Sequence, residues 1–217
     1  MRSAALGMRP HNVTRQDDLR RQALGTLREL EVLMLDGHFD YGNGFHGRVY
    51  LNPHQLFLHP STIWRLAQDL LDVLPSELLA RTDVVTGPAT GGALLAHTLA
   101  GLLDGRRALT HPPCSFAPIT LAGDGFSLRS FYAGRIAGQR VLIADDVRNT
   151  GKTLERCAEL VRQAGGTVIA TVEICDRMEA IADAGAPNFA LVEYPAPQNY
   201  AAAECPMCAA GEPIAHF

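Results

Sequence analysis

Lysine is almost absent from this sequence, because Lys152 is the only lysine among the 19 basic residues and the rest are arginines. A function that needs a mobile ammonium group therefore has one candidate. Acidic residues slightly outnumber basic ones, and the formal net charge is -4. A surface that follows nucleic-acid phosphates normally carries a basic excess, so we expect no nucleic-acid partner and only local phosphate binding.

Long apolar runs are also lacking. None reaches the roughly 18 residues that a membrane helix needs, and the opening residues lack the apolar stretch of a signal peptide. We therefore expect a cytoplasmic protein with no membrane partner. The five cysteines are an odd number without secretory features, which argues against a disulfide framework: Cys114, Cys157, Cys175, Cys205 and Cys208.

The Cys205-Pro206-Met207-Cys208 segment has the spacing of half a zinc site or of a redox pair. Zinc normally takes four ligands and the sequence contains no second C-x-x-C. We interpret the two cysteines as a buried structural thiol pair, with metal binding as the alternative. The histidines show no ligand spacing, so we expect satisfied or surface side chains: His38, His46, His54, His59, His97, His111 and His216.

The length of 217 residues, 47% of them hydrophobic, suits one domain with a small appendage. We expect a loose terminus over residues 1–15 and a single domain over residues 16–217, to which residues 16–75 contribute cap or hood elements. Leucines from Leu19 to Leu30, followed by Met34, recur at helical spacing. Ser61 resembles the N-cap of a second helix.

From residue 83 onward, apolar strands alternate with helices. This order predicts an α/β class with a doubly wound, mostly parallel sheet covered on both faces. Residues 109–138 interrupt the alternation and predict a hairpin that turns at Asp124-Gly125. The expected strands cover residues 83–87, 139–145, 167–176 and 188–194, and the expected helices residues 91–103, 153–166 and 179–185.

The most informative segment is VLIADDVRNTGKT, residues 141–153. An apolar strand ends in Asp145 and Asp146, passes through a short polar loop and enters a helix. Backbone amides of that loop, the hydroxyls of Thr150 and Thr153 and the helix N-terminus can converge on one phosphate. The two carboxylates would repel phosphate but suit the vicinal hydroxyls of a sugar. The pattern therefore predicts a site for a 5-phosphoribose.

A nucleotide-binding P-loop is the main rival interpretation, because Gly151-Lys152-Thr153 matches the end of G-x-x-x-x-G-K-[ST]. That pattern requires glycine at position 146, where this sequence has Asp146. An acidic pair that only caps a turn would not account for the threonines and the glycine that follow it.

The same segment resembles the phosphoribosyl-pyrophosphate signature of type I phosphoribosyltransferases. The resemblance implies that the substrate is bound by Asp145, Asp146, Val147, Arg148, Asn149, Thr150, Gly151, Lys152 and Thr153. TGPATGGALLAHTLA, residues 86–100, resembles the family's pyrophosphate loop. The residues this implies for holding the leaving group are Thr86, Gly87, Pro88, Ala89, Thr90 and Gly91.

Two further matches resemble orotate phosphoribosyltransferases. LDGHFDYGNGFHGRVYLNP is similar to their N-terminal motif, although Asn43 and Gly47 stand where serines are expected and Gly42 stands where some members have lysine. The Asp176-Arg177 pair after a strand is similar to one whose arginine holds the carboxylate of the base. The resemblance, which spans about residues 35–214, implies base-binding roles for Arg177 and Phe39.

The family resemblance implies a five-stranded parallel core with a small N-terminal hood, and a homodimer whose loops complete the neighbouring site. It also implies Mg²⁺ that binds with the pyrophosphate and is not held by protein side chains alone. Many orotate enzymes bring a loop lysine to the pyrophosphate, yet residues 112–140 contain none. We expect arginine to replace it and name Arg129, with Asp145 and Asp146, as catalytic; Arg135 flanks the same loop.

We therefore expect phosphoribosyl transfer from 5-phosphoribosyl-1-pyrophosphate to orotate. Two alternatives stay open. The changes at Gly42, Asn43 and Gly47 could remodel the pocket for another nucleobase. Arg148, Asn149 and Lys152 depart from the small and hydroxyl residues common in the signature, which leaves a non-catalytic regulator that binds phosphoribosyl pyrophosphate.

Overall fold

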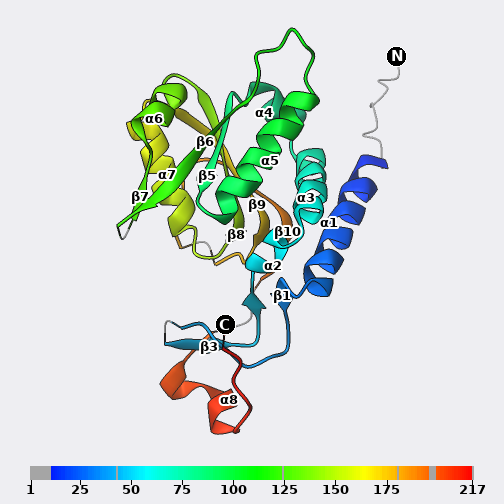
Figure 1. The fold of residues 1–217 in the computed structure, drawn as a ribbon. Helices are drawn as coiled ribbons and strands as arrows, with labels where there is room; N and C mark the ends of the chain where they lie inside the picture. The colour runs from blue at the N-terminus through cyan, green and yellow to red at the C-terminus, as the bar shows by residue number, and fades with distance from the viewer. Residues whose placement is uncertain (1–10, 43, 124, 180, 196–198, 217) are drawn as a thin grey trace, which may run out of the picture.

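The computed structural model describes residues 11–42, 44–123, 125–179, 181–195 and 199–216 (Figure 1), and residues 11–14 only in their backbone. Its centre is a six-stranded sheet in the order β10-β9-β8-β5-β6-β7. Five strands are parallel and β7 pairs antiparallel with β6, which adds a sixth strand at one edge of the expected parallel core. The strands are β5 (Val84–Pro88), β6 (Ser115–Ala122), β7 (Gly125–Ser127), β8 (Arg140–Arg148), β9 (Thr167–Asp176) and β10 (Asn188–Glu193).

Helices cover both faces of this sheet. On one face lie α1 (His11–Glu29), α3 (Pro60–Val73) and α5 (Gly91–Gly105), and on the other lie α6 (Ser130–Ile136) and α7 (Lys152–Gln163) (Figure 1). Each face has its own buried cluster of aliphatic side chains. The short α4 (Ser76–Arg81) precedes β5. The fold is therefore a doubly wound α/β sheet, as the sequence predicts.

The hood is the small lobe below the carboxyl ends of the strands, where Figure 1 labels β3 and α8. We define it as residues 33–51 and 199–216. The pairing of β11 with β3 joins segments from both ends of the chain. Within the N-terminal segment, β3 also pairs with β2, and β1 pairs with β4. Its elements are β1 (Leu33–Met34), β2 (Phe39–Asp40), β3 (Phe45–Gly47), β4 (Tyr50–Leu51), β11 (Tyr200–Ala201), the 3₁₀ helix η1 (Ala202–Glu204) and α8 (Pro206–Ala209). The short α2 (His54–Phe57) connects it to α3.

Residues 16–75 divide between these two places. The helices α1 and α3 lie on the sheet, and α1 contacts both α3 and β10. Only the segment between them enters the hood. The helix α1 begins at His11, and residues 1–10 lie outside the described residues.

Several boundaries differ from the sequence prediction. The first helix ends at Glu29, because Glu31 adopts a left-handed φ of 54° and Met34 then belongs to β1. The second begins at Pro60, whose fixed φ suits the first helical position, so Ser61 lies inside its first turn and is not the N-cap. The predicted hairpin forms between β6 and β7, but Gly125 pairs with Ala122 and so belongs to β7, and Asp124 lies outside the described residues. The helix α6 begins at Ser130.

The predicted helix over residues 179–185 is wrong for the part of it that the structure describes. The backbone amides of Ile181 and Ala182 both donate to the Thr150 carbonyl, and Arg162 donates to the Ala184 carbonyl. These groups are therefore engaged by other segments, and seven residues are too few to nucleate a helix against that competition. Among the described helices, none combines the length and the apolar character needed to cross a bilayer.

Candidate active site

The site lies where the chain reverses its winding. The strands β5 and β8 are neighbours, yet β5 leads into α5 on one face and β8 into α7 on the other. In open α/β sheets a crevice forms at such a point, outside the carboxyl ends of the strands. The two segments that the sequence singles out, residues 86–91 and 145–153, both lie at this crevice. The strand β8 continues past the predicted end at residue 145 to Arg148, so the acidic pair lies on the strand and the loop before α7 covers only residues 149–151.

The loop after β8 is shaped by Gly151 and Thr150. Gly151 is the N-cap of α7, with a φ of 84° that other residues rarely adopt. A Cβ atom there would also lie 2.5 Å from the Ala182 carbonyl oxygen. Both the backbone conformation and the lack of space therefore require glycine. The Thr150 carbonyl accepts hydrogen bonds from the amides of Ile181 (3.1 Å) and Ala182 (2.8 Å). These contacts fix the loop so that the amides at the start of α7 can receive an anion, although that of Lys152 makes a long hydrogen bond of 3.5 Å to Thr150 Oγ1.

The loop after β5 lies directly against the acidic pair. A Cβ atom at Gly91 would collide with the Asp146 carboxylate, and one at Gly92 would lie 2.8 Å from Asp145 Oδ1. A Cβ atom added at Gly87 would likewise collide with the carbonyl groups of Ala144 and Gly92. The peptide bond between Ala89 and Thr90 in this loop is cis. The glycines of residues 86–92 are thus required by the close approach of the two predicted loops.

Burial governs the protonation of the acidic pair. Asp145 is 7% exposed, and burial raises its pKa well above the ordinary range, with the Asp146 charge adding to the effect. Burial also raises the pKa of Asp146, although hydrogen bonds to this carboxylate oppose the shift. The Asp146 Oδ1 accepts from the Val147 amide at 2.7 Å, and Asp145 Oδ1 from the Asp146 amide at 3.0 Å. Donor groups of a ligand, such as ribose hydroxyls, would favour the ionised pair.

A polar network behind the loop was not found by sequence reasoning. The Arg148 guanidinium, expected to bind substrate, instead donates to Asp176 Oδ2 at 2.8 Å in a largely buried pair. Asn188 Nδ2 donates to Glu173 Oε1 at 2.7 Å and approaches Asp176 Oδ2 at 3.3 Å. Burial raises the pKa of Glu173 to about 8. Only the position of Glu173 in an otherwise apolar strand could have signalled this network.

A cavity of about 390 Å³ opens between this loop and the hood. Its volume falls in the usual range for small-molecule sites, roughly 300–1,000 Å³. The phosphate loop, the segment after β9 and the hood each contribute to its walls. The residues that line it are Tyr41, Tyr50, Leu51, Asn149, Thr150, Arg177, Glu179 and Asn199.

Arg177 is the principal cation of this cavity. It is 8% exposed, and among the described residues its Nε and Nη2 have no hydrogen-bond acceptor. Its nearest contacts are loose: Glu179 Oε1 lies 3.4 Å from Nη2 and Asn149 Oδ1 lies 3.4 Å from Nη1. The guanidinium carbon lies 5.6 Å from the centre of the Tyr41 ring. A buried cation with unused donors is costly unless a ligand satisfies it.

The hood closes the cavity with Tyr41. Its hydroxyl donates to the Val49 carbonyl at 2.6 Å and lies 3.2 Å from Asn199 Oδ1, and burial raises its pKa. A Cβ atom at Gly47 would collide with this hydroxyl, which explains glycine where serine is expected. Gly42 has a φ of 71°, a conformation that disfavours lysine. Asn43, the third unexpected residue, lies outside the described residues.

Three predicted site residues lie apart from the cavity or point elsewhere. Phe39 is buried beneath Tyr50, with 5.9 Å between their ring centres, and Gly37 leaves room for its ring. Lys152 is exposed in the first turn of α7. Arg129 is exposed at the start of α6, and its described contacts are backbone hydrogen bonds from Tyr132 and Ala133.

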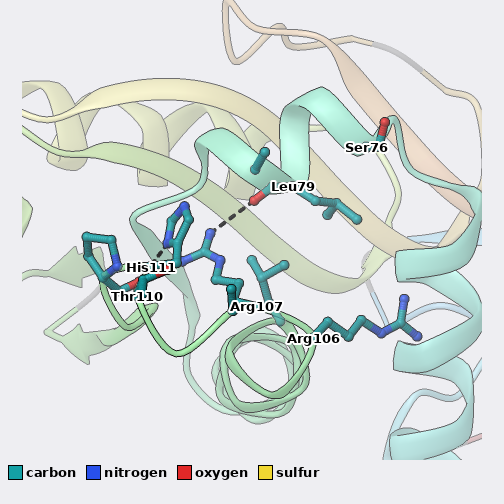
Figure 2. Close-up of a pocket in the computed structure, with 10 residues that line it drawn as sticks. Ser76, Leu79, Arg106, Arg107, Thr110 and His111 are labelled. Carbon is teal, nitrogen blue, oxygen red and sulfur yellow. Dashed lines mark hydrogen bonds between the residues drawn. The ribbon is translucent and has the colours of Figure 1, made fainter.

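A larger cavity of about 490 Å³ lies near the amino ends of β5 and β6, between α4 and the end of α5 (Figure 2). Its two arginines are engaged in structural contacts. Arg107 points toward α4 and donates to the Leu79 carbonyl at 3.0 Å, and Arg106 extends toward α3 and donates to Asp72 at 2.7 Å (Figure 2). This cavity is remote from both predicted loops, so the smaller one is the better candidate.

Comparisons with known proteins agree with this geometry. The family model described as phosphoribosyl transferase domain matches residues 65–188, more than half of the chain. The chain is 35% identical to an orotate phosphoribosyltransferase of Erythrobacter litoralis, over 89% of this chain and 94% of that protein. It is 32% identical to an orotate phosphoribosyltransferase of Acidithiobacillus ferrooxidans, over 82% and 86%.

Solved structures share the fold. Orotate phosphoribosyltransferase from Aeropyrum pernix superimposes with a TM-score of 0.61 at 24% identity, covering 78% of this chain and 92% of that one. Adenine phosphoribosyltransferase from Thermoanaerobacter pseudethanolicus gives 0.59 at 19% identity, covering 77% and 99%. With the family model, the sequence relatives and the two adjoining loops in agreement, the chain belongs to the phosphoribosyltransferase family.

Proposed function

We propose that this protein transfers the phosphoribosyl group of 5-phosphoribosyl-1-pyrophosphate to orotate, which gives orotidine 5′-monophosphate and pyrophosphate for pyrimidine biosynthesis. The observation that carries the choice of base is Arg177, a buried guanidinium with two unused donors beside the phosphate loop. Orotate differs from uracil by a carboxylate, and the planar fork of arginine can bind both carboxylate oxygens together. The sequence relatives named as orotate phosphoribosyltransferases support the same choice.

The reaction exchanges one bond at the anomeric carbon for another. The bond from C1′ to the pyrophosphate oxygen breaks, pyrophosphate departs with the electron pair, and a ring nitrogen of orotate forms the new bond to C1′ and loses its proton. Positive charge builds on the ribose during this exchange. A protein accelerates the step by holding carboxylates near the ring and donors or cations near the departing phosphates.

The residues of the crevice suit these needs. Asp145 and Asp146 would accept hydrogen bonds from the ribose hydroxyls and stabilise the positive ring, since the segment that holds the 5′-phosphate begins directly after them. The start of α7 supplies the amides for that phosphate. Residues 86–91, which abut the acidic pair, would hold the pyrophosphate. Tyr41 and Tyr50 of the hood would enclose the base over Arg177.

Mg²⁺ and a second subunit belong to the same proposal. Mg²⁺ prefers phosphate oxygens, hydroxyls and few protein ligands, and the two carboxylates beside the pyrophosphate loop fit such an ion when substrate brings it. It would neutralise charge on the leaving pyrophosphate. In a homodimer, the exposed Arg129 is free to reach the pyrophosphate of its own or of the neighbouring site.

Turnover with a panel of bases tests this proposal. The purified chain would be given 5-phosphoribosyl-1-pyrophosphate and Mg²⁺ with orotate, uracil or adenine, and pyrophosphate release would be followed. We expect release with orotate alone. Turnover of a base that lacks the carboxylate would make the protein a phosphoribosyltransferase of different specificity. Binding of the pyrophosphate substrate without turnover of any base would make it a regulator.

A further inference from the structure

Four potential metal ligands converge inside the hood: His38, His46, Cys205 and Cys208. One ligand atom from each lies within 4.8 Å of all the others, although the residues come from opposite ends of the chain. We propose that they form a structural zinc site that fastens the C-terminal segment to the hood strands. The proposal differs from the sequence expectation of histidines without a metal role. That expectation rests on spacing along the chain, and the two halves of this site are remote in sequence.

Four of the six distances between these atoms are close to those of a tetrahedral zinc ion. With Zn–N near 2.05 Å and Zn–S near 2.3 Å, tetrahedral geometry places two nitrogens about 3.3 Å apart and a nitrogen and a sulfur about 3.6 Å apart. The His38 Nε2 and His46 Nδ1 are 3.1 Å apart. Cys205 Sγ and Cys208 Sγ lie 3.5 and 3.6 Å from His38 Nε2, and Cys208 Sγ lies 3.3 Å from His46 Nδ1.

The outer nitrogens of both imidazoles face oxygen atoms. The His38 Nδ1 donates to the Glu212 carbonyl at 3.0 Å, and His46 Nε2 lies 3.9 Å from Asp40 Oδ1. The proton on His38 Nδ1 leaves a lone pair on Nε2, directed toward the thiols. His46 would present a lone pair on Nδ1 in the same way with its proton on Nε2, which faces Asp40. Metal-binding histidines are oriented by such outer partners in many proteins.

The chemistry of the four ligands suits a metal. Without a metal, His46 Nδ1 would donate to His38 Nε2 at 3.1 Å; with both protons on the outer nitrogens, the two inner lone pairs would need a cation between them. The two free thiols are weak donors, whereas as thiolates they would offset the charge of a divalent cation. Zn²⁺ accepts two nitrogens and two sulfurs, and four protein ligands leave no open position for catalysis. The ion would therefore be structural.

The position of the site explains what it would stabilise. His38 directly precedes β2, and His46 lies in β3. Cys205 is the N-cap of α8, and Cys208 lies within that helix. The same two segments also share the Arg48–Glu212 ion pair and the pairing of β11 with β3. Because β2 leads directly to Tyr41, the metal would hold the wall of the base cavity in place.

Metal content of the full-length protein, purified without chelator or affinity metal, is the direct test. We expect about one zinc ion per chain when metal content is measured by inductively coupled plasma mass spectrometry. The double variant Cys205→Ser with Cys208→Ser and the single variant His46→Asn should lose it. Matched controls are Cys114→Ser and His111→Asn, which alter a cysteine and a histidine just before the start of β6, at the amino ends of the strands and away from the hood. Both should retain the zinc.

A second measurement avoids dependence on variants that fail to fold. Titration of the unmodified protein with a thiol-specific mercurial should release zinc to a colorimetric chelator as the cysteines react. Replacement of the zinc by Co²⁺ should give the intense visible bands of a tetrahedral cobalt site and a thiolate-to-cobalt absorption. Unmodified protein that takes up neither ion, or zinc that persists in the folded double-cysteine variant, would overturn the proposal.

Discussion

The two sides of the active site are built in opposite ways. On the phosphate side, residues 86–91 and 145–153 are two contiguous segments, each made of the end of a buried strand and the loop that follows it. The groups expected to bind substrate are close together in sequence within each segment. The hood joins residues 33–51 to residues 199–216 through pairing, an ion pair and the four converging His and Cys side chains. The phosphate side can therefore be recognised from a motif, whereas the hood exists only after the chain has folded.

Their electrostatics differ as well. On the phosphate side and beneath it, burial raises the pKa of Asp145, Asp146 and Glu173. In the hood, the carboxyl groups of Asp40 and Glu212 are partly exposed and accept hydrogen bonds. A backbone hydrogen bond from Gly42 lowers the pKa of Asp40, and the Arg48 guanidinium lowers that of Glu212. On the phosphate side the buried carboxyl groups are available to a ligand, whereas in the hood the carboxyl groups stabilise the structure.

The largest effect should follow from removing the charges of the phosphate side. We expect Asp145→Asn with Asp146→Asn to reduce kcat by about 1,000-fold or more, because the ribose loses its carboxylates in the transition state. The melting temperature should be unchanged or higher, since buried charge is removed. Steady-state kinetics and circular dichroism measure both. The adjacent exposed pair in α1 supplies the control, Asp17→Asn with Asp18→Asn, and unchanged turnover in the Asp145 and Asp146 variant would refute the assignment.

Arg177 connects the two sides, and its removal should have the next largest effect. We expect Arg177→Ala to reduce kcat/KM for orotate by about 30-fold or more, which corresponds to about 2 kcal/mol for an unpaired carboxylate. The affinity for 5-phosphoribosyl-1-pyrophosphate, measured by calorimetry, should change little because another loop binds it. Arg135→Ala is an exposed control. Equal losses for both substrates would show that the base is recognised elsewhere.

Much of the phosphate side could be predicted from sequence because its signals are local. The strand over residues 167–176 was located correctly, since apolar periodicity acts over a few residues. The loop after β8 was found only in part, because the strand continues from the predicted end at residue 145 to Arg148. The helix over residues 179–185 was wrong because the Thr150 carbonyl, about 30 positions away, takes two of its amides. The grouping of His38 with Cys205 could not be foreseen, since it requires the pairing of β11 with β3.

The pH dependence of stability should distinguish the two sides. Glu173 has a pKa of about 8 in the folded state against an ordinary value of 4.5. Between these values the folded protein holds a proton that the unfolded chain has released, so stability falls as pH rises. The slope from this group is about 1.4 kcal/mol per pH unit, a tenfold change in the unfolding equilibrium constant. For Asp40 and Glu212, whose pKa is lowered, stability is lost instead as pH falls.

Urea unfolding of the protein and of Glu173→Gln from pH 5 to 8 measures this slope. The variant should lack the decline, and its advantage should grow toward pH 8. Glu155→Gln, exposed in α7 and outside the groups that shift the pKa of Glu173, is the control and should behave like the unmodified protein. Parallel curves for Glu173→Gln and the unmodified protein would mean that Glu173 is ionised in the folded state.

Arg129 tests whether an arginine replaces the missing loop lysine. We expect Arg129→Ala to lower kcat on the order of tenfold with little change in KM, because a cation near the pyrophosphate matters most as the leaving group departs. The effect should be smaller than the 10²–10³ typical of a buried donor, since this side chain is exposed. A change confined to KM would mean a ground-state contact. Mixing Arg129→Ala with the inactive Asp145 and Asp146 variant would restore activity if the arginine acts across a dimer.

The smallest effect should come from Gly47 in the hood, where no charge is altered. A Cβ atom at this position collides with the Tyr41 hydroxyl, which is tied to the Val49 carbonyl at 2.6 Å. Overpacking of this kind costs roughly 1–3 kcal/mol when neighbours cannot move, but Tyr41 can swing toward the cavity at lower cost. Gly47→Ala should therefore raise KM for orotate roughly threefold and leave kcat and the affinity for 5-phosphoribosyl-1-pyrophosphate nearly unchanged. Gly101→Ala in α5, where a Cβ meets no atom within 4 Å, should leave the kinetics unaltered and slightly stabilise the helix. If Gly47→Ala instead weakened both substrates equally, the hood and the phosphate side would be mechanically coupled, and the independence that their separate construction implies would be wrong.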